Sequence, residues 1–371
     1  MAERPTSRRV SPLDAALLIA STLVGYLLVE AGYRALQYRA MLRDIVAAAT
    51  VQIPTDGRPS SVYDPFTGYR YRPNIEVGPA TVPFPVHYRT NRHGLIARED
   101  FPFAKPAGEY RIGVVGDSFT ANVTSTQRWT DVLEDVLNAS ADWRNSIGGR
   151  RTRVINFGLD GIGAVQLGAV AERVALPFDL DLLIVNIIKN DLIRRPHIRR
   201  DEAAISPDQM SDFVRANIMS RLTWLSPYPE VLAVVAGRHL GLTPHLTMAA
   251  LEDALSQGLY YASVDQAAPG AVAAIETILG LFPRAVFLLD RTYPELIGAT
   301  TPTSQLEDEV LDELRAQLPS VAWTSVAADE RVPRAVIDRW FNVPNDQHRS
   351  DAGVRAYGEA VAAYLMRRAG R

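Results

Sequence analysis

The fold is decided by one stretch, Ile112-Gly-Val-Val-Gly-Asp-Ser118. Its apolar first half predicts a short buried strand, and its second half predicts a tight turn into a helix. Open α/β proteins place their ligands at the carboxyl ends of such strands. The free N–H groups at the start of the helix would stabilise negative charge on a substrate oxygen. Ser118 is therefore a candidate nucleophile, and the alternative is that Asp117 and Ser118 only cap the helix.

Further apolar runs repeat this pattern along the chain. Strands are expected at 111–115, 153–157, 181–188 and 285–290, with helical patterns between them. This alternation predicts a parallel sheet that is covered by helices on both faces. Glycine or polar residues follow two of these strands: Gly161 lies in a glycine-rich turn after the second run, and Lys189-Asn190-Asp191 comes after the third. Near the C-terminus, Asp346 and His348 precede a helix-like segment.

Over roughly residues 110–366 the chain resembles the SGNH or GDSL hydrolase superfamily, because four sequence blocks occur in the family's order. They are a serine block (Gly116-Asp117-Ser118), a glycine block (Gly161), an asparagine block (Asn190-Asp191) and a histidine block (Asp346-Gln347-His348). The resemblance implies a three-layer α/β/α, flavodoxin-like fold with a parallel central sheet. It further implies that Ser118 is the nucleophile, His348 its general base and Asp346 the group that orients the imidazole. The implied oxyanion hole consists of the Ser118 and Gly161 N–H groups and the Asn190 side chain. Serine chemistry requires such partners, because a hydroxyl is a weak nucleophile until a base takes its proton.

Two residues depart from the commonest family pattern. The usual Asp-x-x-His spacing would place the acid at Asn345, which cannot neutralise a charged histidine, so Asp346 is the predicted acid. An Asp-x-His spacing resembles membrane-associated, polysaccharide-modifying branches of the superfamily. Lys189 stands where the family usually has glycine, and it either narrows the site, binds an anionic substrate or is a surface lysine at a strand end. Asp117, Lys189 and Asp191 are the candidate substrate-binding residues.

Other charged residues have an ordinary interpretation beside a functional one. A lone histidine is usually structural or solvated, and we expect this of His87, His93, His197, His239 and His245. The run from Arg194 to Arg200 either lines an entrance for an acidic polymer or lipid headgroup, or forms a solvated face.

The N-terminal region contains a candidate membrane span. Residues 15–29 carry no charge, and the segment 12–33 is long enough to cross a bilayer core. Arg4, Arg8 and Arg9 precede it, which predicts a cytoplasmic N-terminus and an exported catalytic domain. Arg34, Arg39 and Arg43 weaken this asymmetry. A cleaved signal peptide and a soluble helix are the alternatives.

Composition narrows the class of protein. The 371 residues are 47% hydrophobic and 22% charged, which indicates a folded domain. The net charge of −3 shows no excess of basic residues of the kind that nucleic-acid binding requires. There is no cysteine, so disulfides, a lipoprotein anchor and a thiolate metal site are excluded. No metal or other cofactor is expected.

The expected organisation has five parts. A cytoplasmic tail (1–11) and a membrane anchor or signal peptide (12–33) precede a stalk (34–61) and an extended, hairpin-like leader (62–109). The hydrolase-like domain follows at 110–371, with a helical insertion at about 201–280 that interrupts the strand–helix alternation.

The expected function is that of an exported serine esterase or acyltransferase. Its expected substrates are ester-linked acyl groups, foremost O-acetyl groups on a cell-surface polysaccharide. The expected partners are this acylated carbohydrate or ester, the membrane through the N-terminal helix, and other membrane proteins of a polysaccharide pathway. One alternative is a lipid or short-chain ester hydrolase, and another is a catalytically silent carbohydrate-binding or assembly subunit.

Overall fold

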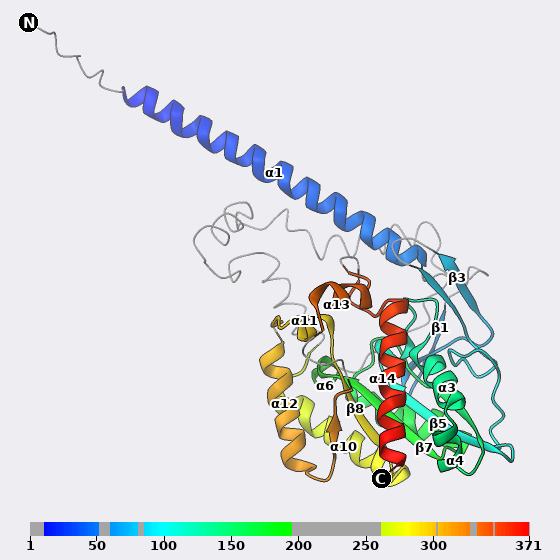
Figure 1. The fold of residues 1–371 in the computed structure, drawn as a ribbon. Helices are drawn as coiled ribbons and strands as arrows, with labels where there is room; N and C mark the ends of the chain where they lie inside the picture. Colours follow the sequence, from blue (N-terminus) through cyan, green and yellow to red (C-terminus); the bar gives the residue numbers. More distant parts are fainter. Residues whose placement is uncertain are drawn as a thin grey trace, which may run out of the picture. The chain divides into compact units, whose positions relative to one another are not determined.

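The computed structural model describes residues 11–51, 60–80, 85–194, 261–301, 303–326, 332–343 and 346–370. The chain divides into two units, one holding residues 1–46 and 211–256 and the other holding residues 47–210 and 257–371. The sheet and every element of the candidate site belong to the second unit (Figure 1).

A five-stranded parallel sheet forms the centre of the second unit. Its strands lie in the order β6 (Arg151–Asn156), β5 (Glu109–Gly116), β7 (Leu182–Ile188), β8 (Val286–Asp290) and β9 (Trp323–Thr324). Counted along the chain this is the order 2-1-3-4-5 of a doubly wound, flavodoxin-like sheet. The predicted α/β class with a parallel central sheet is confirmed.

The register brings the carboxyl ends of the central strands to one edge. Gly116 at the end of β5 pairs with Asn186 of β7, and Ile188 at the end of β7 pairs with Asp290 at the end of β8. The chain leaves β5 toward β6 on one side and reaches β7 on the other. The crevice at such a reversal of strand order is where open α/β sheets bind ligands.

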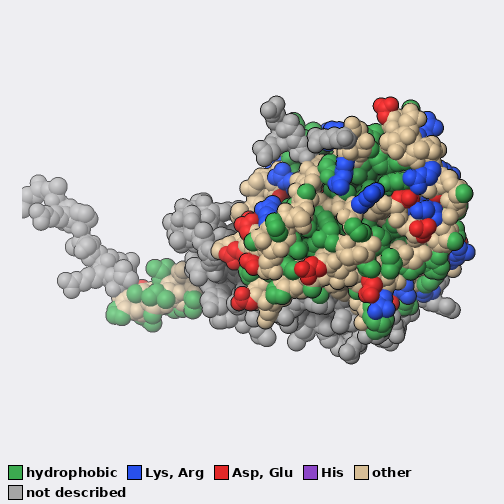
Figure 2. Space-filling model, turned by 90° about the horizontal axis from the view of Figure 1, so that it is seen from below, with side chains coloured by type: hydrophobic (Ala, Val, Ile, Leu, Met, Phe, Trp, Pro, Cys, Tyr) green, Lys and Arg blue, Asp and Glu red, His purple; other side chains and the backbone are tan. Residues whose placement is uncertain are grey.

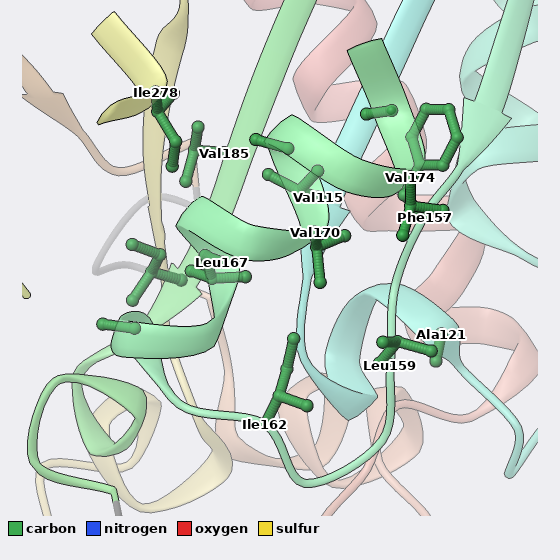
Figure 3. Packing of buried hydrophobic residues seen from close by; sticks show 14 of the residues in the cluster. Val115, Ala121, Phe157, Leu159, Ile162, Leu167, Val170, Val174, Val185 and Ile278 are labelled. Carbon is green, nitrogen blue, oxygen red and sulfur yellow. The ribbon is translucent and has the colours of Figure 1, made fainter. Parts of the chain in front are cut away.

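Helices cover both faces of the sheet, because successive strand residues point to opposite sides. Ile112 and Val114 face α3 (Trp129–Ala139), α4 (Ala141–Ser146) and α14 (Asp351–Ala369). Val115 faces α5 (Ala164–Val170), α10 (Val264–Leu281) and α12 (Ser304–Gln317). Figure 3 shows this second layer, in which Leu167 and Val170 of α5 pack close to the strand residues.

Shorter helical segments connect these layers. They are α2 (Ser118–Ala121), a π-helical turn (Ala171–Ala175), a 3₁₀ turn (Leu176–Phe178), α6 (Lys189–Ile193), α11 (Tyr293–Leu296) and α13 (Arg334–Trp340).

Two antiparallel hairpins precede the sheet, in the segment predicted to be extended and hairpin-like. They are β1 (Ser61–Asp64) with β2 (Gly68–Tyr71), and β3 (Glu76–Ala80) with β4 (Val86–Arg89). The Tyr69 hydroxyl donates to the Asp160 carbonyl at 2.5 Å, and the Asp160 N–H donates to the Tyr71 hydroxyl at 3.2 Å. The first hairpin therefore holds the loop that carries Gly161.

The predicted helical insertion at about 201–280 overlaps α10, one of the helices that cover the sheet. Residues 264–280 belong to α10, whose buried alanines and Ile278 pack in the same core as Val115 and Leu167. The remainder of the insertion, up to residue 260, lies outside the described residues.

Helix α1 spans Pro12–Val51 at the N-terminal end of the described residues. Its segment Pro12–Tyr33 is long and apolar enough to cross a membrane, a test that a signal sequence near the N-terminus also passes. Large apolar side chains such as Leu18 and Leu28 are each 67–69% exposed along it. The arginines at positions 4, 8 and 9 lie outside the described residues.

The described surface is of mixed character. On the face shown in Figure 2, basic and acidic side chains both occur among hydrophobic ones. This distribution agrees with the net charge of −3.

Candidate active site

Ser118 begins helix α2 at the point where β5 ends. Asp117 caps this helix, because its carboxylate accepts from the Phe119 N–H at 2.9 Å. The turn requires glycine at position 116, where an added Cβ would lie 2.2 Å from Thr120 Oγ1 and 2.5 Å from the Asn186 carbonyl oxygen. The local sequence thus places the Ser118 hydroxyl at the carboxyl edge of the sheet, as expected.

The structure brings His348 and Asp346 to this serine. The Ser118 Oγ and His348 Nε2 atoms are 2.8 Å apart, and His348 Nδ1 is 2.6 Å from Asp346 Oδ1. The carboxylate can only accept, so Nδ1 carries the proton and Nε2 accepts from the serine. A second acceptor, Asp117 Oδ2, lies 3.1 Å from the same Oγ. The three predicted catalytic side chains therefore form an unbroken hydrogen-bonded path.

The segment around His348 is fixed from both sides. Asp346 Oδ1 also accepts from the His348 backbone N–H at 2.5 Å, and the imidazole packs against the Phe119 ring at a centroid distance of 5.1 Å. The next residue, Arg349, forms a buried ion pair with Asp290 at the end of β8. This pair attaches the histidine segment to the sheet.

The electrostatic environment adjusts the pKa of both partners. Burial lowers the pKa of His348, but the hydrogen bond and charge of Asp346 raise it more, so the pKa lies above its ordinary value of 6.5. Burial raises the pKa of Asp346, but the interaction with His348 outweighs it and lowers the pKa below 3.8. Asp346 is therefore ionised near neutral pH, as a group that stabilises an imidazolium must be.

The predicted oxyanion-hole donors lie on adjacent loops of the same edge. Ser118 N is at the start of α2, Gly161 lies in the turn after β6, and Asn190 is the second residue of α6 after β7. Gly161 has φ of +78°, a conformation that suits glycine. The Asn190 amide donates to Glu307 Oε1 at 3.1 Å, which leaves its second N–H for a substrate.

Residues 112–233 match the family model described as GDSL-like Lipase/Acylhydrolase. This stretch of the chain is therefore similar to GDSL-like lipase/acylhydrolase domains. No curated protein matches the chain at a significant level.

Several solved structures resemble the chain. The lipase/acylhydrolase from Enterococcus faecalis is 11% identical with a TM-score of 0.38, and the match covers 70% of this chain and 96% of that one. An acetylxylan esterase from Geobacillus stearothermophilus is 10% identical with a TM-score of 0.36, covering 71% and 94%. A putative GDSL-like lipase from Parabacteroides merdae is 15% identical with a TM-score of 0.38, covering 71% and 100%. The fold assignment rests on the strand order and register described above.

Two of the predicted substrate-binding residues, Asp117 and Asp191, lie beneath the site. Asp117 and Asp191 are 0% and 1% exposed. Burial raises the pKa of Asp191 well above its ordinary value, and the charge of Asp117 raises it further. In this structure both carboxylates support the site, because Asp117 caps α2 and Asp191 accepts from the Ile188 N–H before α6, and their role in substrate binding stays a prediction.

Lys189, the third predicted substrate-binding residue, is paired with acidic side chains. Its Nζ lies 2.7 Å from Asp308 and 3.4 Å from Glu295, and its side chain is 25% exposed. Burial lowers the pKa of Lys189, but these two partners raise it more, to above 10.5. The lysine charge is thus already balanced within the protein.

Sequence reasoning missed two residues that surround Asn190. Arg194 is 18% exposed and contacts both buried aspartates, although the run that it begins was expected at an entrance or on a solvated face. Glu307 is 7% exposed and accepts from Asn190. Asp191 and Arg194 are three residues apart, a spacing that signals an ion pair on a helix, whereas the pairing of Asn190 with Glu307 has no local signal.

The remaining histidines within the described residues have other partners. His87 contacts Glu76 at 2.8 Å, and His93 contacts the Phe101 carbonyl at 2.8 Å. His197, His239, His245 and the alternative acid position, Asn345, lie outside the described residues. In the part of the chain that the structure describes, no group of three or more His, Asp or Glu side chains is arranged to hold a metal ion.

Proposed function

We propose that the protein is an exported, membrane-anchored serine esterase or acyltransferase. Its proposed substrates are ester-linked acyl groups, foremost O-acetyl groups on a cell-surface polysaccharide. The observation that carries the proposal is the path from Ser118 Oγ to His348 Nε2 at 2.8 Å and from His348 Nδ1 to Asp346 at 2.6 Å.

The proposed mechanism follows from this arrangement. His348 takes the proton as Ser118 Oγ attacks the acyl carbonyl, and the Ser118, Gly161 and Asn190 donors bind the oxyanion. The imidazolium, held by Asp346, then protonates the leaving alcohol oxygen. The acyl-enzyme reacts with water in hydrolysis or with a sugar hydroxyl in transfer; His348 accepts the proton of the incoming nucleophile and returns it to Ser118 Oγ as the acyl–oxygen bond breaks. Both outcomes use the same residues.

Export and anchoring are proposed from the N-terminal segment. The span Pro12–Tyr33 contains 22 residues, about 33 Å of helix at 1.5 Å per residue, which matches the hydrocarbon core of a bilayer. Arg4, Arg8 and Arg9 favour retention of the N-terminus in the cytoplasm. Intact mass of the purified mature protein distinguishes this anchor from a cleaved signal peptide.

The geometry of the site also bears on the two alternative functions, a silent subunit and a lipid or short-chain ester hydrolase. A silent subunit has no need for a serine–histidine contact, so the 2.8 Å separation favours catalysis. A lipid or short-chain ester hydrolase is the second candidate. It is favoured by a buried apolar group beside His348, formed by Phe119, Ile188, Ile337 and Phe341.

The test compares the full-length protein in detergent with its Ser118→Ala variant. Release of free carboxylic acid is measured from short-chain aryl esters, from long-chain esters and from an acetylated polysaccharide. We expect Ser118-dependent release, lower by several orders of magnitude in the variant. Transfer is recognised by formation of new acyl esters when a sugar acceptor is added. Equal release by both proteins would refute the proposal.

A further inference from the structure

We propose that Arg194 is a positioning residue that fixes the three oxyanion-hole donors relative to one another. This inference rests on the proposed esterase or acyltransferase function, because the hole acts only on a tetrahedral acyl intermediate. Arg194 follows α6 directly, and its side chain is 18% exposed. Its guanidinium contacts the immediate surroundings of each donor.

The first two contacts reach the serine turn and the glycine loop. Arg194 Nη1 lies 3.5 Å from Asp117 Oδ2, the carboxylate that caps α2 and precedes Ser118. The same nitrogen donates to the Ile162 carbonyl at 3.2 Å, in the residue that follows Gly161. One nitrogen therefore connects the loops after β5 and β6.

The third contact orients the Asn190 amide. Arg194 Nη2 donates to Asn190 Oδ1 at 2.9 Å, and Asn190 Nδ2 donates to Glu307 Oε1 at 3.1 Å. A guanidinium has no acceptor and an ionised carboxylate has no donor, so only one orientation of the amide satisfies both neighbours. In that orientation the remaining N–H of Nδ2 is held as a donor for the oxyanion.

Burial makes this arrangement dependent on the arginine. Asp117 and Asp191 are almost fully buried, and Arg194 Nη1 is 3.1 Å from Asp191 Oδ1. Without the guanidinium two neighbouring carboxylates would face each other, and removal of one partner from a buried ion pair is strongly unfavourable. The shape of a guanidinium also matters, because its fork of donors reaches several acceptors at once, whereas a lysine ammonium is a single point charge.

The glycine loop is built to approach this arginine closely. A Cβ added at Gly163 would lie 2.6 Å from the Arg194 carbonyl oxygen and 3.0 Å from the Arg194 Cβ. The absence of a side chain at position 163 therefore allows the loop that carries Gly161 to lie against the end of α6.

The test measures kcat and KM for a short-chain aryl ester with full-length wild type, Arg194→Ala and Arg194→Lys. Loss of one oxyanion-hole donor lowers kcat by about 10²–10³-fold. We expect a fall of about 100-fold for Arg194→Ala with KM changed less than about threefold, since the hole acts on the transition state. Added guanidinium ion, below denaturing concentrations, should restore kcat of Arg194→Ala at least about tenfold by supplying the same donors.

Arg111→Ala is the matched control. Arg111 is 0% exposed and donates from Nη1 to the carbonyls of Phe103 and Phe178, near the opposite end of β5. Per folded molecule, its kcat should stay near that of wild type and should not respond to guanidinium.

The possible outcomes separate this inference from the proposed function. Absence of Ser118-dependent turnover in wild type would overturn the proposed function and this inference with it. Normal wild-type turnover, with kcat of folded Arg194→Ala within threefold of wild type, would overturn only the role of Arg194. If Arg194→Ala does not fold, the kcat of Arg194→Lys tests the positioning role of Arg194 instead. A loss of tenfold or more at an unchanged Tm supports positioning, and a wild-type kcat refutes it.

Discussion

Replacement of Asp346 by asparagine tests the assignment of the catalytic acid. In Asp346→Asn the amide oxygen can keep both contacts to His348, at 2.5 and 2.6 Å, so the main change is loss of the negative charge. At 2.6 Å and an effective dielectric constant of about 20, a carboxylate and an imidazolium attract by about 6 kcal/mol. Asp346 is 24% exposed, which reduces this value through solvent screening. We expect kcat/KM to fall by about 10³–10⁴-fold, or about 4–5.5 kcal/mol in the barrier.

The same variant should change the pH profile. The base acts in its neutral form, and the wild-type pKa of His348 is raised above 6.5 chiefly by Asp346 against the lowering effect of burial. The acid limb of kcat/KM should therefore have its midpoint above pH 6.5 in wild type. It should move to lower pH in Asp346→Asn, where burial is opposed only by the weaker effects of the Asp160 and Asp117 charges.

The assay is hydrolysis of a short-chain aryl ester between pH 5 and 9. Asn345→Ala is the control, because position 345 is where the commoner family spacing would place the acid, and its kcat/KM should remain within about threefold of wild type. The reasoning would be refuted by an Asp346→Asn variant with kcat/KM within tenfold of wild type, or by an acid limb that does not move.

Three further substitutions test the supports of the site. Tyr357→Phe removes the hydroxyl that donates to Asn186 Oδ1 at 2.6 Å, so urea denaturation should show a free energy of unfolding lower by about 1–3 kcal/mol; an unchanged value would contradict this role. Gly158→Ala places a Cβ 2.3 Å from a backbone nitrogen of α2, and we expect kcat/KM to fall about 10–100-fold, whereas Gly280→Ala, which meets open space, should keep wild-type activity. Lys189→Ala loses two partly exposed ion pairs and should cost less than about 1 kcal/mol in stability, with KM for a neutral ester unchanged; a KM raised tenfold would instead show contact with the substrate.

The sheet was predictable because its strands are buried on both faces. Such strands are continuous apolar runs, as in Leu182–Ile188, and they are recognisable without knowledge of their neighbours. The edge strand β9 was not expected, since Trp323–Thr324 is too short to form a pattern. Helix α10 was assigned to the predicted helical insertion because the whole stretch 201–280 fits the strand–helix alternation poorly. Its small side chains instead allow close packing, and Gly168 of α5 would place a Cβ 3.1 Å from the Ala274 Cα.

The residues of the candidate site were predictable for a different reason. Ser118, Gly161 and Asn190 each follow a predicted strand, and parallel strands bring their carboxyl ends to one edge. Asp346 and His348 are two residues apart, so their contact is local.

The supports of the site depend on long-range contacts. Arg194 lies 77 residues from Asp117, and Glu307 lies 117 residues from Asn190. A charged residue in a polar run has no local feature that distinguishes burial from exposure. Only the completed sheet shows that these side chains surround the same loop.

The separation of the proposed nucleophile from its proposed base has a consequence for biosynthesis. Ser118 and His348 are 230 residues apart in the chain, and the segment that carries His348 is attached to β8 by the ion pair between Arg349 and Asp290. At a translation rate of roughly 5–20 residues per second, the ribosome needs about 10–50 s to add that stretch. During this interval the nascent polypeptide carries Ser118 without its proposed base. The proposed acyl chemistry therefore cannot begin on the ribosome before the histidine segment has been synthesised.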